Sequence, residues 1–376
     1  MDDLLAPTVT PPAGVAQTLA PPGLPFQDDR SLKRRRVQQI LEARGAHTLM
    51  LTSFEALSWY FDGARVSIAA GGPPIIAVAV SAASETVFCF NNERERMLHE
   101  ELPADLGTLV AVPWHRPLVP HDLAPGRPGV LQEAEVPAEL RAARATLLPG
   151  ELARYRTLAA EMAQVLTATL GELTAHTTEI EVARQLGTRI TEVGGEPLVL
   201  LVAGEKRLGF RHPLPTAAPV GNRAMAVICA RRHGMIVNLS RWVRFTEPSA
   251  AEQNLAGRIA EVEADAFAAT VPGASVASIL ADIASSYGAH GFRADEWEHH
   301  HQGGPTGYVG RDPRATPTVP DLVAPGQVFT WNPTAPGTKI EDTVLLTPNG
   351  IEVLTVDQTW PTTEVRGLAR PIELLL

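Results

Sequence analysis

The sequence predicts a two-domain protein of mixed α/β class, and three observations lead to that prediction. The chain has 376 residues, which fits two domains or one large α/β unit rather than one small core. Hydrophobic residues make up 45% and charged residues 20%, a balance typical of a folded globular protein. Short apolar runs alternate with helical patterns along most of the chain, which indicates strands packed with helices.

Residues 1–26 are predicted to be a proline-rich arm. Residues 1–25 contain six prolines, and a segment of this composition holds neither a helix nor a sheet ladder. A mobile arm and an arm that wraps a partner subunit both fit this composition.

Residues 27–147 are predicted to form the first domain. The stretch 31–45 has its apolar residues on one helical face and a stop signal at Gly45. Short apolar runs typical of strands follow at residues 47–53, 75–80 and 85–90. This alternation indicates an α/β domain.

Residues 150–376 are predicted to form the second domain, after a linker at residues 148–150. A helical pattern covers residues 151–174, and Thr178 with Glu181 forms a capping box that begins a second helix. Two more amphipathic helices are expected at residues 250–270 and 275–288. Runs typical of strands occur at residues 198–204, 224–232, 234–245, 326–333 and 341–347. The simplest packing of these elements is a mostly antiparallel sheet covered by helices.

Charge and composition exclude several functional classes. The net charge of −10 argues against nucleic-acid binding, which normally needs a basic face. No apolar run reaches the length of a membrane span, and the first residues lack the pattern of a signal peptide. The two cysteines, Cys89 and Cys229, form no disulfide framework. These features predict a cytoplasmic protein with no nucleic-acid or membrane partner.

Five motifs follow one another along the second domain. They are GFRHPLP around His212, the strand pair at residues 224–245, WEHHHQGGPTGYVGRD at residues 297–312, GQVFTWNP at residues 326–333 and TKIEDTVLLT at residues 338–347. In this order they resemble the motifs of the pita-bread superfamily of creatinase, aminopeptidase P and methionine aminopeptidase. The resemblance covers roughly residues 30–360, and residues 27–147 resemble the N-terminal domain of its creatinase and prolidase-like members.

The resemblance implies five metal-ligand positions, and most of them have lost ligand chemistry. They read Val227, Asn238, His300, Asn332 and Glu341. The superfamily has four carboxylates and one imidazole there, whereas this chain keeps one carboxylate and one imidazole. Two divalent ions bring about four positive charges and prefer carboxylate oxygens. We therefore expect a pocket that works without a metal or any other cofactor.

The second half of the histidine motif resembles creatinase, a superfamily member that works without metal. The run His300-His301-Gln302-Gly303 is followed, at matching spacing, by Tyr308-Val309-Gly310-Arg311-Asp312. This resemblance implies that Arg311 binds a substrate carboxylate, for which a planar guanidinium is well suited. Ser240 stands where creatinase carries an active-site glutamate, so identical chemistry is not expected.

Three consecutive histidines leave the identity of the pocket residue open. In an extended segment His299 and His301 would share one face and His300 the other. The creatinase spacing selects His300, and a register shifted by one residue selects His301. The tract also fits a single bound zinc ion, or histidines that hydrogen-bond to the acidic residues within 295–298.

The predicted site draws on all these motifs. The catalytic candidates are His212, His300 and Glu341, with His212 as the proton carrier because imidazole suits proton transfer near neutral pH. The substrate-binding candidates are Arg311, Asn238, Asn332, His301, Tyr308 and Arg65, the last of them toward a neighbouring subunit's pocket.

The lost ligands and the resemblance together predict a metal-independent hydrolase that acts as a homodimer. It would cleave a C–N bond (amidino, amide or lactam) of a small substrate that carries an anionic group. Three alternatives stay open: a lyase, isomerase or cyclase that uses the same pocket, an Xaa-Pro peptidase-like metalloenzyme, and a non-catalytic pita-bread module that binds peptide.

Overall fold

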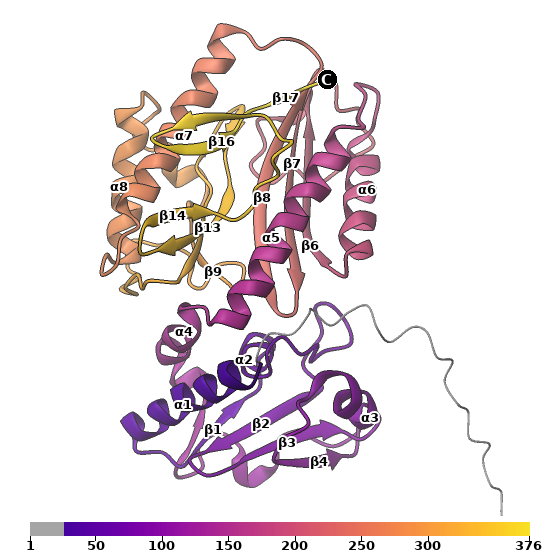
Figure 1. The fold of residues 1–376 in the computed structure, drawn as a ribbon, viewed down its shortest axis with the longest axis vertical. Coiled ribbons are helices and arrows are strands. Elements are labelled where there is room, and N and C mark those ends of the chain that lie inside the picture. Colours follow the sequence, from indigo (N-terminus) through magenta and orange to yellow (C-terminus); the bar gives the residue numbers. More distant parts are fainter. Residues whose placement is uncertain (1–25) are drawn as a thin grey trace, which may run out of the picture.

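The computed structural model describes residues 26–376, so the proline-rich arm lies outside the described residues except for Phe26, which begins the first helix. Two bodies follow one another along the chain in Figure 1, with residues up to about 145 in the lower one. The expected division into domains of 27–147 and 150–376 stays a prediction.

The lower body is built on a five-stranded mixed sheet with the order β4-β3-β2-β1-β5. Its strands are β1 (Thr48–Leu51), β2 (Ile76–Ser81), β3 (Glu85–Phe90), β4 (Thr108–Val112) and β5 (Val130–Gln132). Its helices are α1 (Phe26–Arg44), α2 (Phe54–Tyr60), α3 (Arg94–Arg96) and α4 (Pro137–Ala145). The three strands expected here from their apolar runs are present.

The upper body contains two four-stranded sheets (Figure 1). The first has the order β17-β8-β7-β6, from β6 (Glu196–Gly204), β7 (Arg223–Arg232), β8 (Met235–Arg244) and β17 (Leu374–Leu375). The second has the order β14-β13-β10-β9, from β9 (Gly303–Thr306), β10 (Val328–Trp331), β13 (Asp342–Thr347) and β14 (Gly350–Val353). The upper body also contains two small separate hairpins. One pairs β11 (Thr334–Ala335) with β12 (Thr338–Lys339), and the other pairs β15 (Thr362–Val365) with β16 (Leu368–Pro371).

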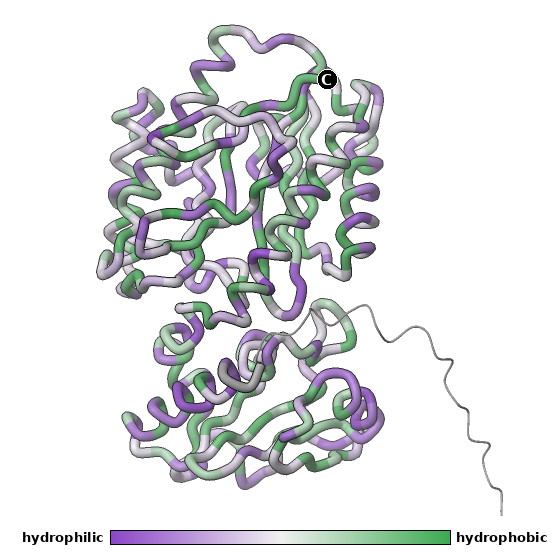
Figure 2. The backbone as a smooth tube through the Cα atoms, in the orientation of Figure 1, coloured by the Kyte–Doolittle hydropathy of each residue, from purple (hydrophilic) through white to green (hydrophobic). Residues whose placement is uncertain are grey.

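Four helices cover these sheets. They are α5 (Pro149–Leu170), α6 (Glu179–Glu192), α7 (Ala250–Ala269) and α8 (Val276–Ala289). One buried cluster joins α5 and α6 to the sheet of β6, β7 and β8, and another joins α7 and α8 to the sheet of β9, β10 and β13. Figure 2 shows hydrophobic and hydrophilic residues alternating along α6, as expected of a helix with one buried face. The mixed α/β class with mostly antiparallel sheets under helices is thus confirmed.

The helix boundaries follow local signals, with one correction. The backbone N–H of Thr178 donates to the Glu181 carboxylate over 2.8 Å, and the Thr178 hydroxyl accepts from the backbone N–H of Glu181, so the predicted capping box is present. The predicted linker at residues 148–150 is wrong. Leu148 is the N-cap and Pro149 opens α5, because proline has no N–H to lose in a first turn.

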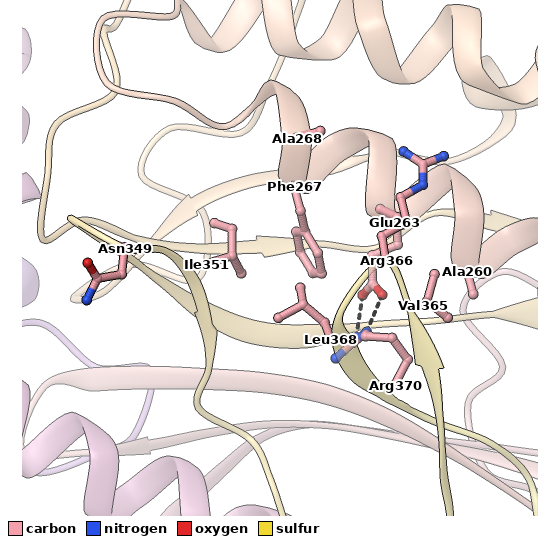
Figure 3. Close-up of a pocket in the computed structure, with 11 residues that line it drawn as sticks. Ala260, Glu263, Phe267, Ala268, Asn349, Ile351, Val365, Arg366, Leu368 and Arg370 are labelled. Atoms are coloured by element: carbon pink, nitrogen blue, oxygen red, sulfur yellow. Dashed lines mark hydrogen bonds and ion pairs between the residues drawn. The ribbon is translucent and has the colours of Figure 1, made fainter.

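Buried ion pairs anchor the start of β13. The Arg370 guanidinium bonds both Glu263 oxygens over 2.7 Å and an Asp342 oxygen over 2.8 Å, and all three residues are buried. Glu263 and Arg370 line a cavity of about 290 Å³ between α7 and the β15–β16 hairpin. Figure 3 shows the two side chains bonded to each other. This cavity contains none of the predicted site residues. Its ion pairs hold β13, the strand that directly follows Glu341.

The described residues include no helix with the length and apolar character needed to cross a membrane.

We predict that acid weakens the fold through His233, which forms the two-residue turn between β7 and β8 with Gly234. Burial, together with the positive charges of Arg154, Arg232 and Arg65, lowers the pKa of His233 to about 4. An unfolded histidine has a pKa of about 6.5, so the unfolded chain binds the extra proton between these values. The free energy of unfolding should therefore fall as the pH drops from 6.5 to 4.

Urea unfolding of His233→Asn tests this, since asparagine tolerates the left-handed φ of 49° at this position. The variant should match the parent protein at pH 7.5 and lose less stability at pH 4.5. An equal loss in both proteins would contradict the assignment.

Candidate active site

Most of the predicted site residues, all except Tyr308 and Arg65, lie near the junction of the two sheets of the upper body, between β8 and the segment that leads into β13. The backbone N–H of Asn238 donates to the Thr343 hydroxyl over 3.0 Å, and that hydroxyl donates to the Asn238 carbonyl over 2.9 Å. Two residues after Asn238 on β8, the backbone N–H of Ser240 donates to the Glu341 carbonyl over 3.0 Å. These bonds join strands more than 100 residues apart in the sequence and fix Glu341 relative to Asn238.

The Glu341 carboxylate is buried between two positive side chains. One oxygen lies 2.8 Å from the Arg311 guanidinium and the other lies 3.1 Å from the Lys339 ammonium. Burial opposes ionisation of Glu341, but these two charges outweigh it and hold its pKa below the usual range. Glu341 is therefore an ionised, fully paired carboxylate.

This donor set does not fit two divalent metal ions. Of the five ligand positions, only Glu341 carries a carboxylate, and Lys339 and Arg311 already neutralise it. Val227 is buried in an apolar cluster, and asparagine stands at the positions of two further carboxylates. A second divalent ion would meet uncompensated positive charge here.

The two asparagines keep unpaired polar atoms in the described structure. Asn238 and Asn332 are both buried, with 5% and 3% of their surface exposed. The amide nitrogen of Asn238 and the amide oxygen of Asn332 have no partner among residues 26–376. A buried amide without a partner is costly, so one donor on Asn238 and one acceptor on Asn332 need partners that the described residues do not supply.

Three histidines form a cluster beside this carboxylate. The cluster consists of His212, His300 and His301, and one ring nitrogen of each lies within 4.8 Å of those of the other two. The Nε2 atoms of His212 and His300 are 3.2 Å apart, and the His300 and His301 rings stack with centroids 4.4 Å apart. His300 is buried, His301 half-buried and His212 exposed, so the cluster leads from solvent into the protein.

The structure corrects the expected alternation of the histidine tract. His299 ends a short 3-10 helix (Glu296–His299) and reaches Asp295 on the surface, while His300 and His301 both join the cluster. The expected sharing of one face by His299 and His301 is wrong, because alternation holds for extended backbone and this turn interrupts it.

Burial and nearby positive charge keep the cluster neutral. Burial, with the charge of Lys339 added, lowers the pKa of His300 to about 2. Burial and the charge of Arg311 lower the pKa of His301 to about 3. Burial and Lys339 also lower the pKa of His212. At neutral pH each ring therefore offers one N–H donor and one lone pair.

Two expected substrate-binding residues lie elsewhere in this chain. Tyr308 is fully buried, and its hydroxyl donates to Glu151 over 2.8 Å at the start of α5. Arg65 lies in the lower body, exposed and paired with Glu101 over 2.6 Å. The structure brings neither of them to the histidine cluster.

Sequence reasoning missed Lys339, although a local signal was present. Residues two apart in an extended segment share a face, and Lys339 is two residues before Glu341. A second group, the half-buried Cys229, is paired with Asn238 across the β7–β8 ladder. Burial raises the pKa of Cys229 to about 12, so it stays a thiol and not a nucleophilic thiolate.

Comparisons with known proteins agree with this architecture. The sequence model for metallopeptidase family M24 matches residues 153–348. Dipeptidase PepE from Mycobacterium ulcerans has a TM-score of 0.73 and 18% identity, covering 94% of this chain and 99% of its own. Prolidase from Pyrococcus horikoshii has a TM-score of 0.71 and 16% identity, covering 87% and 98%.

A third solved structure, X-Pro aminopeptidase from Thermotoga maritima, has a TM-score of 0.70 and 16% identity, covering 92% of this chain and 100% of its own. Among curated proteins, none matches this sequence. At these identities the structural likeness shows the fold, and the pita-bread fold expected from the motifs is confirmed.

We predict that Glu341→Gln destabilises the protein by about 3 kcal/mol, because it leaves the buried positive charges of Lys339 and Arg311 without their counter-charge. Urea unfolding at pH 7 measures the change. The double variant Lys339→Met/Glu341→Gln should recover part of the loss, since it removes one of the two uncompensated charges. A loss below about 1 kcal/mol in the single variant, as for an exposed pair, would contradict this.

Proposed function

The chain belongs to metallopeptidase family M24, and from this premise we propose that it hydrolyses an amide-type C–N bond in a small substrate that carries a carboxylate. One observation carries the proposal: the single carboxylate left at the metal-ligand positions, Glu341, is held by Lys339 and Arg311. Side chains thus supply positive charge that bound metals would otherwise bring. The chemistry is therefore assigned to the chain's own residues.

The names of the structural neighbours bear on the bond that is cleaved. They are a prolidase, a dipeptidase and an X-Pro aminopeptidase, so they favour a peptide or peptide-like substrate. On substrate class they support the Xaa-Pro peptidase-like alternative better than creatinase-like cleavage of an amidino compound. On metal use, the donor set supports a reaction without the paired ions.

His212 makes the proton transfers in this proposal, and His300 positions it. Free water has a pKa of about 15.7, so a positioned base must take its proton as the oxygen attacks the carbonyl carbon. His212 is exposed and neutral, and its Nε2 faces that of His300 at 3.2 Å. The proton accepted by His212 then passes to the leaving nitrogen as the C–N bond breaks, while the buried His300 orients the His212 ring.

The charge that develops on the carbonyl oxygen needs donors aimed into the pocket. The unpaired amide N–H of Asn238 and the ammonium of Lys339 are the available donors. Glu341 then acts as a positioning residue, because its two oxygens hold Lys339 and Arg311 in place.

We assign the substrate carboxylate to Arg314 together with Arg311. A cleft of about 430 Å³ next to α4 is lined by both arginines. Arg311 already bonds Glu341 and the Gly310 carbonyl, whereas Arg314 is exposed and has no ion pair or hydrogen bond within residues 26–376. The charge of Arg314, after burial and Lys339, contributes to lowering the pKa of His212, which places Arg314 close to the cluster.

A homodimer and a cytoplasmic location remain predictions. In the dimer, Arg65 would reach the neighbouring subunit's pocket, since it does not reach the pocket of its own chain.

We predict that His212→Ala lowers kcat about 1,000-fold, the scale that a positioned acid–base group contributes. The assay is release of free amine from a panel of Xaa-Pro and other dipeptides, lactams and guanidino acids, with and without a chelator. His299→Ala is the matched control, because His299 lies one turn away on the surface. Unchanged turnover in His212→Ala would contradict the mechanism. Loss of activity with the chelator would show that the reaction needs a metal.

We predict that Arg314→Ala raises KM about 10-fold with little change in kcat, since a lost charged hydrogen bond at a partly exposed site costs roughly 1.4 kcal/mol. Capping the substrate carboxylate as an amide should raise KM in the parent enzyme and have little further effect in the variant. Arg293→Ala is the control, since Arg293 pairs with Asp295 on the surface. If capping raises KM by the same factor in the parent enzyme and the variant, the assignment is wrong.

A further inference from the structure

The histidine cluster has the composition and spacing of a single metal site, separate from the two-ion pattern described above. Two ligand nitrogens at about 2.0–2.1 Å from a tetrahedral zinc ion lie about 3.3 Å apart. The Nε2 atoms of His212 and His300 are 3.2 Å apart, and nitrogens of all three rings lie within 4.8 Å. A small ring rotation of His301 would bring the third nitrogen to the same separation.

The three rings are prepared for a ligand in two further ways. Ligating histidines must be neutral, and the pKa values of all three are lowered by burial and neighbouring positive charge. The Nδ1 atom of His301 is buried without a hydrogen-bond partner among residues 26–376, whereas His300 would ligate through Nε2, the atom that faces His212. His300 has only 7% of its surface exposed, so its nitrogens depend on partners inside the site.

We propose that His212, His300 and His301 bind one zinc ion, and that bound zinc inhibits the enzyme. The inhibition rests on the proposed function, in which the lone pair of His212 accepts a proton. Zinc takes that same lone pair, so proton transfer and metal binding exclude each other. The site differs from the superfamily pattern because only His300 belongs to the five positions.

The surroundings decide which metals bind and how tightly. Three neutral imidazoles suit Zn²⁺, Ni²⁺ and Cu²⁺, whereas Mg²⁺ and Mn²⁺ prefer oxygen ligands. The nearby charges of Lys339 and Arg311 exceed the charge of Glu341 by one and oppose a cation. Binding should therefore be reversible and weaker than at a site with a carboxylate ligand, which suits inhibition at raised zinc concentration.

Calorimetric titration of the full-length, chelator-stripped protein with zinc chloride tests the site. We expect one zinc ion per chain and no heat with magnesium or manganese chloride. Loss of a second-shell partner alone costs about 10–100-fold in affinity, so His301→Ala and His212→Ala should each weaken zinc binding about 100-fold or more. His299→Ala, from the same tract but outside the cluster, should bind like the parent protein.

Cobalt provides a readout that is independent of activity. Four-coordinate Co²⁺ absorbs visible light, so cobalt bound by the three histidines should give bands that are absent in His301→Ala and present in His299→Ala. Circular dichroism of each variant checks that it is folded. Absence of stoichiometric zinc, or an equal loss of affinity in His299→Ala, would overturn the site.

Amine release measured across the same zinc titration separates this proposal from the function it rests on. Inhibition that follows the occupancy measured by calorimetry supports both. Zinc binding with activation would overturn the inhibition and the metal-free reaction together, while the site itself would stand. Zinc binding by a chain that cleaves no substrate in the panel would overturn the proposed function and the inhibition, but not the site.

Discussion

The buried carboxylate of Glu341 is ionised because Lys339 and Arg311 contact its two oxygens, and the chemistry of the pocket depends on this balance. A buried carboxylate without such partners would protonate or destabilise the fold. With them, the region carries a small excess of positive charge. Burial, with that excess added, keeps the neighbouring histidines neutral, and the excess disfavours a pair of divalent cations.

The surrounding structure holds this charge cluster in place. Arg370 bridges Glu263 and Asp342 beneath β13, and Thr343 joins β13 to Asn238 on β8. These groups are buried and bonded to one another, so small displacements would leave charges unpaired in the interior. The position of Glu341 is therefore determined by contacts on both sides of the seam between the sheets.

The histidine cluster has two uses that compete for the same atoms. In the proposed reaction, His212 carries a proton from water to the leaving nitrogen while His300 orients its ring. In the proposed metal site, the same nitrogens together with His301 bind one zinc ion. The charge of Lys339 opposes both uses, because it lowers the proton affinity of His300 and repels a divalent cation more strongly than a proton.

Local patterns in the sequence account for the elements and for the chemistry that is missing. The capping box at Thr178 and the strand runs could be read from residue types and spacing, since each depends on neighbours in the chain. The loss of carboxylates at Val227, Asn238 and Asn332 follows only from the resemblance to the pita-bread superfamily. The start of α5 at Pro149 was missed because a helical first turn and a linker share that composition.

Which side chains meet was decided only by the tertiary structure. His212 reaches His300 across 88 residues, and Arg311 reaches Glu341 across 30. Packing between distant segments also decides three further features. They are the burial of Tyr308, the outward position of His299 and the unpaired state of Arg314. The sequence by itself determined the fold class, because residue type and periodicity act locally, and its resemblance to the superfamily implied the loss of a paired-metal donor set. The charge pairs and the histidine contacts lie where the two sheets of the upper body meet. There, separation along the sequence does not show which residues are close in space.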